Sequence, residues 1–281
     1  MSRPHPETIS PTAHYTGYVW FAHGQSHEAF ATRTGRILYQ ALRGPNLAAL
    51  KAGWPTLEGM LVARHKLIDH RLSRAIEDDG VSQIIEVAAG LSPRGWRFRN
   101  RYGDRITYIE ADLPGMIARK RRILAELGGE TAHHRTAEIN ALVDDGPTSI
   151  DALAAALDQT RGTAIITEGL INYFDRSQTV GMWHRFSRAL ARFPTSRYFS
   201  DIILGEANRG ALMTGFALLL GMFVRGRVYT DFSDAADVTG ALASANLDGT
   251  VLDPRDFTRD LGELEREGAG RVRIIEAMPL S

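Results

Sequence analysis

The chain contains no cysteine among its 281 residues. This absence excludes disulfide bonds, cysteine nucleophiles, and thiolate-bound zinc or iron–sulfur sites. Long apolar runs are also missing: the longest, 215–224, is far below the roughly 20 residues that a membrane span requires. Residues 1–11 hold three prolines and lack the apolar core of a signal peptide. We therefore expect a cytoplasmic protein with no membrane partner.

Neither sign of charge is in excess, because Lys and Arg total 33 and Asp and Glu also total 33. This balance does not favour a nucleic-acid partner. The triplet Lys120-Arg121-Arg122 is short and, on a predicted helix, is typical of a solvated face. Hydrophobic residues make up 44% of the chain, which is enough for a sizeable core.

Apolar runs of strand length alternate with helical patterns over most of the chain. We expect strands at 82–88, 106–110, 132–136, 163–167, 197–204, 250–252 and 271–277. We expect helices between them at 93–102, 114–127, 148–159, 177–191, 206–224 and 232–245. Such alternation predicts an α/β fold with a mostly parallel, doubly wound sheet.

The segment before the first strand is helical and aromatic, and its second half carries apolar residues at helix-face spacing. We expect residues 1–12 to be disordered, and Gly44-Pro45 and Gly53-Trp54-Pro55 to interrupt the helices. The chain is thereby divided into an N-terminal helical lid over 1–79 and a core over 80–281. A helical cap is expected as an insertion at about 205–248.

The first candidate site is the turn after the strand at 82–88. Glu86 lies in the strand, and Ala88 and Gly90 follow it before a helix restarts. A strand, a tight turn and a helix in this order bind nucleotide-like ligands at the carboxyl end of the strand. Two of the three glycines of G-x-G-x-x-G are missing, which disfavours a pyrophosphate and leaves a phosphate-free ligand such as S-adenosylmethionine acceptable. A buried strand that ends in a tight turn is the alternative.

Two further strands end in acidic residues. Asp112 is suited to hold two ribose hydroxyls, although Glu110 shares its side of the strand and stays an alternative. Glu168, followed by Gly169, would face a positive sulfonium and amino group; otherwise it is a charge favoured by a helix dipole. The carboxyl ends of parallel strands share one edge, so these acids predict one site.

These motifs resemble the leucine carboxyl methyltransferase family of class I S-adenosylmethionine-dependent O-methyltransferases, and more closely its bacterial branch associated with polyketide biosynthesis. The resemblance covers about 57–204 and is carried by 63–69, 86–92, 108–114 with 119–120, and 167–174. It implies the Rossmann-like class I methyltransferase sheet, with seven strands and helices on both faces. The two last strands near the C-terminus favour this sheet over the symmetric halves of a dehydrogenase.

The resemblance also implies S-adenosylmethionine as cofactor and assigns roles at its two ends. Arg64 would bind the cofactor carboxylate in a bidentate pair. Asp112 would hold the ribose, and Glu168 would close the methionine end.

Further cofactor contacts are implied between those ends. Gly90 would line the methionine moiety, next to Glu86 and to Ala88, which replaces a frequent glycine of the family. Glu138 and Ile139 would occupy the adenine-contacting position, where the family usually has Asp-Leu and where glutamate has a longer reach.

Methyl transfer from a sulfonium is an in-line displacement, so catalysis consists mostly of positioning and exclusion of water. A carboxylate acceptor is already ionised near pH 7 and needs no base. Tyr173 and Asn172 are then expected to orient it, as catalytic residues, with help from arginine at 225 or 227. A hydroxyl acceptor needs a base, for which the candidates are His14, His23 and His27.

We therefore expect an S-adenosylmethionine-dependent O-methyltransferase that acts on a small molecule of secondary metabolism. The alternatives are an NAD(P)-dependent oxidoreductase on a similar sheet and a methyltransferase-like binding protein that transfers nothing. No metal site is expected. His23-x-x-x-His27 lacks the acid of His-Glu-x-x-His, and His133 and His134 would point to opposite sides of a strand.

Overall fold

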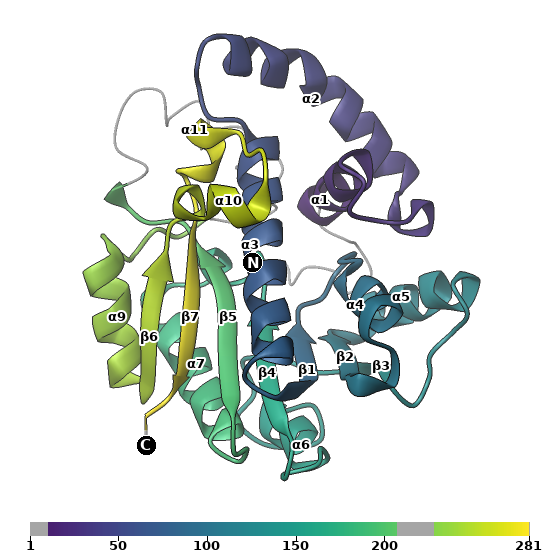
Figure 1. Cartoon of the computed structure of the whole chain (residues 1–281), viewed down its shortest axis with the longest axis vertical. Helices are drawn as coiled ribbons and strands as arrows, with labels where there is room; N and C mark the ends of the chain where they lie inside the picture. Colours follow the sequence, from purple (N-terminus) through teal and green to yellow (C-terminus); the bar gives the residue numbers. More distant parts are fainter. Residues whose placement is uncertain (1–10, 207–227, 281) are drawn as a thin grey trace, which may run out of the picture.

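The computed structural model describes residues 11–206 and 228–280, and a seven-stranded sheet lies at its centre (Figure 1). The strands are β1 (Val81–Val87), β2 (Thr107–Asp112), β3 (His134–Glu138), β4 (Gly162–Thr167), β5 (Ser196–Ile202), β6 (Leu247–Leu252) and β7 (Arg273–Pro279). Their order is β3-β2-β1-β4-β5-β7-β6. Strands β1 to β5 are parallel, and β7 is antiparallel between β5 and β6. All seven predicted strands are confirmed.

The central strands are apolar on both faces because helices cover both. In β1, Ile84 packs in the core under α3 and α4, whereas its neighbour Ile85 packs in the core under α6, α7 and α9. In β4, Ile165 packs in the same core as Ile85, and Ile166 packs in the same core as Ile84. Figure 1 shows α3 crossing one face of the sheet and α7 lying behind the other. This arrangement explains why these strands read as continuous apolar runs.

From residue 57 onward, the described helices include those predicted between the strands and two short ones, at 258–261 and 266–269, that were not predicted. They are α3 (Leu57–Glu77), α4 (Arg94–Tyr102), α5 (Pro114–Glu126), α6 (Ile150–Ala155), α7 (Arg176–Leu190), α9 (Ala235–Ser244), α10 (Thr258–Leu261) and α11 (Arg266–Ala269). Short 3-10 turns are η1 (Glu28–Phe30), η2 (Gly103–Arg105), η3 (Ile171–Tyr173) and η5 (Pro254–Phe257). Helix α6 is shorter than the expected 148–159. The helix expected at 206–224, like the arginines at 225 and 227, lies outside the described residues.

Two helices, α1 (Pro11–Ala22) and α2 (Arg33–Lys51), precede α3 and lie beyond the carboxyl ends of the parallel strands (Figure 1). Thr32 and Thr56 begin α2 and α3 as N-caps, because each hydroxyl accepts a hydrogen bond from a backbone N–H of the first turn. The interruption predicted at 53–55 is confirmed, since α2 ends at Lys51 and α3 begins at Leu57.

The segment expected to be disordered, 1 to about 12, lies outside the described residues except for its last two positions, which belong to α1. One expectation about this region is wrong. Pro45 lies inside α2, although proline in a helix interior costs about 3 kcal/mol. Tertiary contacts on both sides of Pro45 hold the helix: Leu42 is buried, and Asn46 donates hydrogen bonds to Tyr15 Oη at 3.1 Å and Glu58 Oε2 at 3.3 Å.

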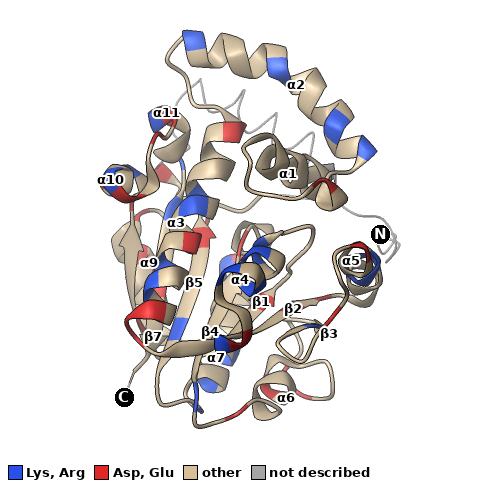
Figure 2. Ribbon diagram, turned by 45° about the vertical axis from the view of Figure 1, so that its right-hand side comes forward, with Lys and Arg blue, Asp and Glu red and all other residues tan. Residues whose placement is uncertain are grey.

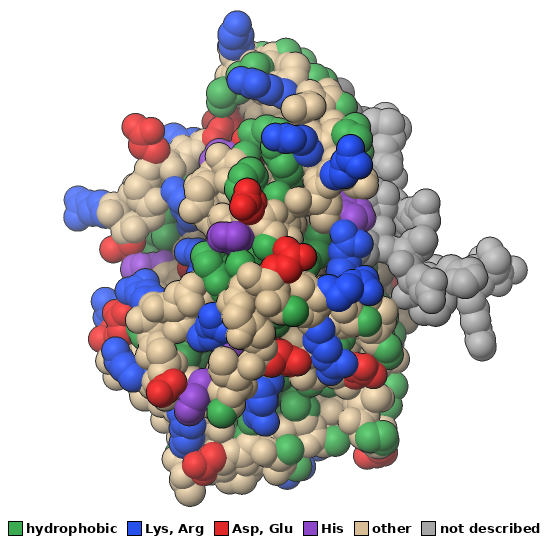
Figure 3. All heavy atoms as spheres, turned by 90° about the vertical axis from the view of Figure 1, so that its right-hand side faces the viewer, with side chains coloured by type: hydrophobic (Ala, Val, Ile, Leu, Met, Phe, Trp, Pro, Cys, Tyr) green, Lys and Arg blue, Asp and Glu red, His purple; other side chains and the backbone are tan. Residues whose placement is uncertain are grey.

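Charges of both signs are distributed over the molecule. Figure 2 shows acidic and basic residues side by side on several helices, and the face seen in Figure 3 has blue and red side chains interspersed. None of the described helices is long and apolar enough to cross a membrane.

Candidate functional site

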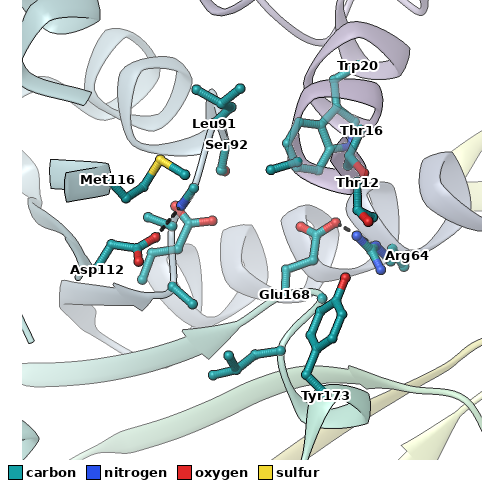
Figure 4. A pocket seen from close by; sticks show the side chains of 17 residues that line it. Thr12, Thr16, Trp20, Arg64, Leu91, Ser92, Asp112, Met116, Glu168 and Tyr173 are labelled. Atoms are coloured by element: carbon teal, nitrogen blue, oxygen red, sulfur yellow. Dashed lines mark hydrogen bonds and ion pairs between the residues drawn. The ribbon is translucent and has the colours of Figure 1, made fainter. Parts of the chain in front are cut away.

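A cavity of about 330 Å³ lies at the carboxyl ends of β1, β2 and β4, with α1 on its far side (Figure 4). We call one wall the strand side, made of Ala88, Gly90, Asp112 and Met116. The opposite wall is the lid side, made of Thr12, Thr16, Trp20, Arg64, Glu168 and Tyr173. The cavity is thus placed at the sheet edge that the strand-end acids predicted.

The strand side is a tight turn held by one carboxylate. The backbone N–H of Gly90 donates to Asp112 Oδ2 at 2.8 Å, and the N–H of Leu113 donates to Asp112 Oδ1 at 2.7 Å. Ala88 and Gly90 both have positive φ, 54° and 49°, which brings the chain back on itself after β1. Burial raises the pKa of Asp112, although the two N–H groups oppose this. The small side chains leave room for a ligand to approach the backbone.

The lid side centres on Glu168, which ends β4. Its Oε1 accepts from Arg64 Nε at 3.0 Å, and its Oε2 lies 2.9 Å from His65 Nδ1. Burial alone would raise the pKa of Glu168, but His65, Arg94 and Arg64 together hold it well below its ordinary value. Glu168 is therefore a carboxylate near neutral pH.

Arg64 joins Glu168 to a second strand-end acid, Asp201 of β5. Its Nη1 donates to Asp201 Oδ2 at 3.0 Å, and Asp201 Oδ1 accepts from the Gly169 N–H at 2.6 Å. Two nitrogens of the guanidinium are thus bound to protein carboxylates, whereas the sequence assigned Arg64 to a ligand carboxylate.

Arg94, the first residue of α4, lies underneath and is fully buried. Its Nε donates to Asp69 Oδ1 at 2.6 Å, its Nη1 to Glu86 Oε1 at 2.5 Å, and its Nη2 to Glu168. Burial opposes its charge, but these three carboxylates hold the pKa of Arg94 well above its ordinary value. Arg94 therefore joins α3, β1 and β4 under the cavity.

Helix α1 presents one face to the cavity. Thr12, Thr16 and Trp20 are spaced four residues apart, so they share a side of the helix. The Tyr173 side chain forms a hydrogen bond with the Thr12 side chain, and burial raises the pKa of Tyr173. Tyr173 is accordingly a neutral phenol at pH 7.

Seven of the ten predicted site residues line this cavity: Arg64, Glu86, Ala88, Gly90, Asp112, Glu168 and Tyr173. Glu86 does so as part of the charge network, because its second oxygen accepts from the Tyr108 hydroxyl at 2.8 Å. Glu110, the alternative to Asp112, is buried away from the cavity between Lys120 and His134, with His134 Nε2 2.6 Å from its Oε1.

The other three predicted residues are not among those that line the cavity. Asn172 joins two backbone segments: its Nδ2 donates to the carbonyls of Ile203 and Tyr229, and its Oδ1 accepts from the Ile203 N–H. These three hydrogen bonds give Asn172 a structural role, in which its amide links two segments of the backbone. Glu138 is the last residue of β3 and Ile139 follows it; the glutamate is exposed near Arg121, and the isoleucine is buried in the core.

The histidines considered as bases are engaged elsewhere. His14 Nδ1 lies 2.8 Å from Thr32 Oγ1, and His23 Nε2 lies 2.6 Å from Glu58 Oε1. His27 accepts from the Ala29 N–H at 3.2 Å as the cap of η1.

Sequence reasoning assigned no role to Arg94, His65 or Asp201. For Trp20, one of the aromatic residues of the predicted lid, it left open whether the side chain lines an acceptor pocket or packs the lid onto the core. The position of Arg94 could have indicated its role. A cation in the first turn of a helix interacts unfavourably with the helix dipole, so an arginine there suggests acidic partners nearby. Asp201 carried a signal as well, as an acid inside an apolar strand. Trp20 is brought to the site only by the packing of α1.

The strand order, with an antiparallel seventh strand beside the fifth, and a cavity at the carboxyl ends define the class I methyltransferase fold. A "putative methyltransferase" from Thermobifida fusca superposes with a TM-score of 0.64 at 12% identity, covering 97% of this chain and 96% of that one. A DUF574 family protein from Streptomyces avermitilis also gives 0.64, at 15% identity over 98% and 100%. At these identities the likeness shows the fold alone.

Residues 20–184 match the leucine carboxyl methyltransferase family, and the chain belongs to that family. A "putative S-adenosyl-L-methionine-dependent methyltransferase" of Mycobacterium leprae is 30% identical over 196 residues, 70% of this chain and 61% of that protein. One of the same description from Mycobacterium tuberculosis is 33% identical over 121 residues, 43% and 38% of the two chains. This chain thus spans less than two thirds of these relatives. The predicted family is confirmed, and S-adenosylmethionine is the cofactor named for its relatives.

Proposed function

We propose that this protein is an S-adenosylmethionine-dependent methyltransferase that methylates an oxygen atom of a small molecule. The observation that carries the proposal is the cavity itself. It brings together a small-residue turn, a strand-end carboxylate at Asp112 and a second carboxylate at Glu168, under the α1 face. Family membership supports the same chemistry.

The lining residues fit the cofactor. The positive φ of Gly90 and the small Ala88 let a nucleoside lie against the backbone, and Asp112 offers carboxylate oxygens to ribose hydroxyls. Glu168, kept ionised by its neighbours, offers negative charge to the amino group and the sulfonium. When bound, the cofactor supplies an electrophilic methyl group. The residues around it bind, orient and exclude water, with α1 over the reacting centre.

We favour a carboxylate over a hydroxyl as the methyl acceptor. The histidines at 14, 23 and 27 have partners outside the cavity, whereas Tyr173 lines it as a neutral hydrogen-bond donor. A donor suits an acceptor that is already ionised, which needs orientation and no base. The resemblance to the polyketide-type branch supports an acceptor from secondary metabolism. In this proposal α1 and α2 form the lid over the acceptor.

Calorimetric titration with S-adenosylmethionine, S-adenosylhomocysteine, NAD and NADP tests the cofactor. We expect micromolar binding of the two adenosyl-sulfur ligands alone. Binding of a nicotinamide cofactor would instead establish an oxidoreductase. A second assay follows the release of S-adenosylhomocysteine with a panel of small carboxylic acids and phenols. Release with acids but not phenols supports the acceptor proposed here, and release with phenols alone contradicts it.

A further inference from the structure

Trp20 carries an unused hydrogen-bond donor beside the cavity. The residue is 5% exposed and belongs to the lid side, where Figure 4 shows it descending from α1 above Arg64 and Glu168. Its Nε1 is buried and has no partner among the described residues. Burying such a group costs about 1–3 kcal/mol unless a partner is provided. A ligand that fills the cavity can provide it.

The indole is held in one orientation by its neighbours. Its ring centroid lies 4.5 Å from that of His65 at an interplanar angle of 33°, and His65 is itself bound to Glu168. Trp20 therefore sits at the Glu168 end of the cavity and away from Asp112, which Figure 4 shows on the opposite wall. A ligand held at Asp112 by its ribose would extend its other end toward the indole N–H.

The charges at the Glu168 end of the cavity favour a neutral hydrogen-bond donor. Arg64 already donates to Glu168 and Asp201, and Arg94 also donates to Glu168, so both acids place negative charge directly beside Arg64. A ligand carboxylate that approaches Arg64 also meets that negative charge. A neutral N–H can donate a hydrogen bond to the ligand carboxylate. It adds no further cation that would compete for the two acids. Hydrogen bonds to charged groups are the stronger class.

We propose that the Trp20 indole N–H donates a hydrogen bond to the carboxylate of the bound cofactor, as a binding residue that supplements Arg64. This inference rests on the proposed function. It assigns to α1 a direct part in cofactor binding.

The test compares two ligands that differ only in the carboxylate. S-adenosylhomocysteine and its decarboxylated analogue, which keeps the amine, are titrated calorimetrically into the full-length protein and into Trp20→Phe. Phenylalanine keeps an aromatic ring over His65 and removes the N–H. We expect the variant to bind S-adenosylhomocysteine roughly ten- to a hundredfold more weakly, and the analogue as well as wild type does. Trp54→Phe, at a side chain that is 50% exposed, is the matched control and should change neither affinity.

Each other result overturns the inference. Equal losses for both ligands would mean that Trp20 acts through packing. Unchanged affinity for both ligands would mean that the N–H does not bind the cofactor and remains available to the methyl acceptor. If wild type binds neither ligand, the proposed function fails first, which is a distinct outcome.

A second measurement does not depend on a variant that folds. Wild-type protein with isotope-labelled tryptophan gives indole N–H resonances for its four tryptophans. We expect the Trp20 resonance to shift with S-adenosylhomocysteine but not with the decarboxylated analogue. The Trp183 resonance, whose N–H already donates to Tyr198 Oη at 3.2 Å, should stay unchanged with both. An unmoved Trp20 resonance, or one moved equally by both ligands, contradicts the proposal.

Discussion

The two walls of the cavity are built in different ways. The strand side needs residues from only two consecutive strand ends, with one carboxylate, Asp112, bound to two backbone N–H groups. The lid side needs side chains from α1, α3, α4, β4 and β5, joined by Arg64, Arg94 and Glu168 into one buried ionic network. A single cavity can thus combine a local motif with a wall that only the complete fold creates.

The two walls also differ in the direction in which they shift the pKa of their carboxyl groups, Asp112 and Glu168. Burial raises the pKa of Asp112, whereas the cations around Glu168 lower its pKa. We therefore expect substitutions in the ionic network of the lid side to affect folding first, and substitutions on the strand side to affect ligand binding first.

Loss of Arg94 should produce the largest effect. Arg94→Met leaves Asp69, Glu86 and Glu168 buried without their shared cation, and breaking a buried ion pair typically costs 3–5 kcal/mol. We expect a decrease of about that size in the free energy of unfolding at pH 7, measured by urea denaturation.

Arg74→Met is the matched control for Arg94→Met. Arg74 pairs with Asp78 on the exposed surface of α3, where an ion pair contributes about 1 kcal/mol or less. Similar losses in the two variants would mean that burial of the network does not determine its contribution.

The charge of Glu168 should give the lid side a pH dependence. A folded-state pKa below the ordinary 4.5 contributes stability that is fully present above that pH and is lost as pH falls through the folded-state value. Glu168→Gln removes this contribution, so we expect it to be about 2–3 kcal/mol less stable than wild type at pH 7. The difference should shrink as pH is lowered below 4.5. A difference that stays constant with pH would assign the loss to packing.

The two walls also differ in what could be predicted from sequence. The turn at 88–90 and the acid at Asp112 are close along the chain, and strand spacing alone aligns them at one sheet edge. Glu168 follows the same rule as the end of β4. Arg94 lies only a few residues after that turn, but its three partners lie 8 to 74 positions away, and no local pattern indicates which acids it meets.

Contacts between distant segments also explain why the expectation at Pro45 is wrong and why Asn172 has a structural use that its residue type does not reveal. Pro45 was assigned to a break because local propensity disfavours a helix there, yet contacts of Leu42 and Asn46 outweigh that cost. Asn172 has the residue type of an orienting donor, and its use between the Ile203 and Tyr229 backbones depends on segments far along the chain.

Asp112→Asn should separate binding from stability. Loss of the carboxylate should weaken S-adenosylhomocysteine binding roughly ten- to a hundredfold, because a charged acceptor for the ribose is lost. The raised pKa of Asp112 means that folding disfavours its ionised form, so wild type gains stability as pH falls toward 3.8. Asp112→Asn should therefore lie within about 1 kcal/mol of wild type at pH 7, where one lost N–H acceptor offsets the removed charge. Calorimetry measures the affinity for S-adenosylhomocysteine, and urea denaturation measures the free energy of unfolding. A large loss of stability with unchanged affinity would mean that the strand side serves folding and not ligand binding.

The smallest effect should come from Ala88, where the strand side carries backbone strain. Ala88 has a φ of 54°, a region that costs a non-glycine residue roughly 1–2 kcal/mol, while glycine loses roughly 0.5–1 kcal/mol more on folding than alanine. We expect Ala88→Gly to raise the free energy of unfolding by up to about 1 kcal/mol. Ala89→Gly is the control, since Ala89 has no positive φ, and it should lower stability by roughly 0.5–1 kcal/mol. Opposite signs at these adjacent positions would support strain in the backbone of the turn at Ala88. Equal destabilisation by both substitutions would show that the turn at Ala88 carries no strain.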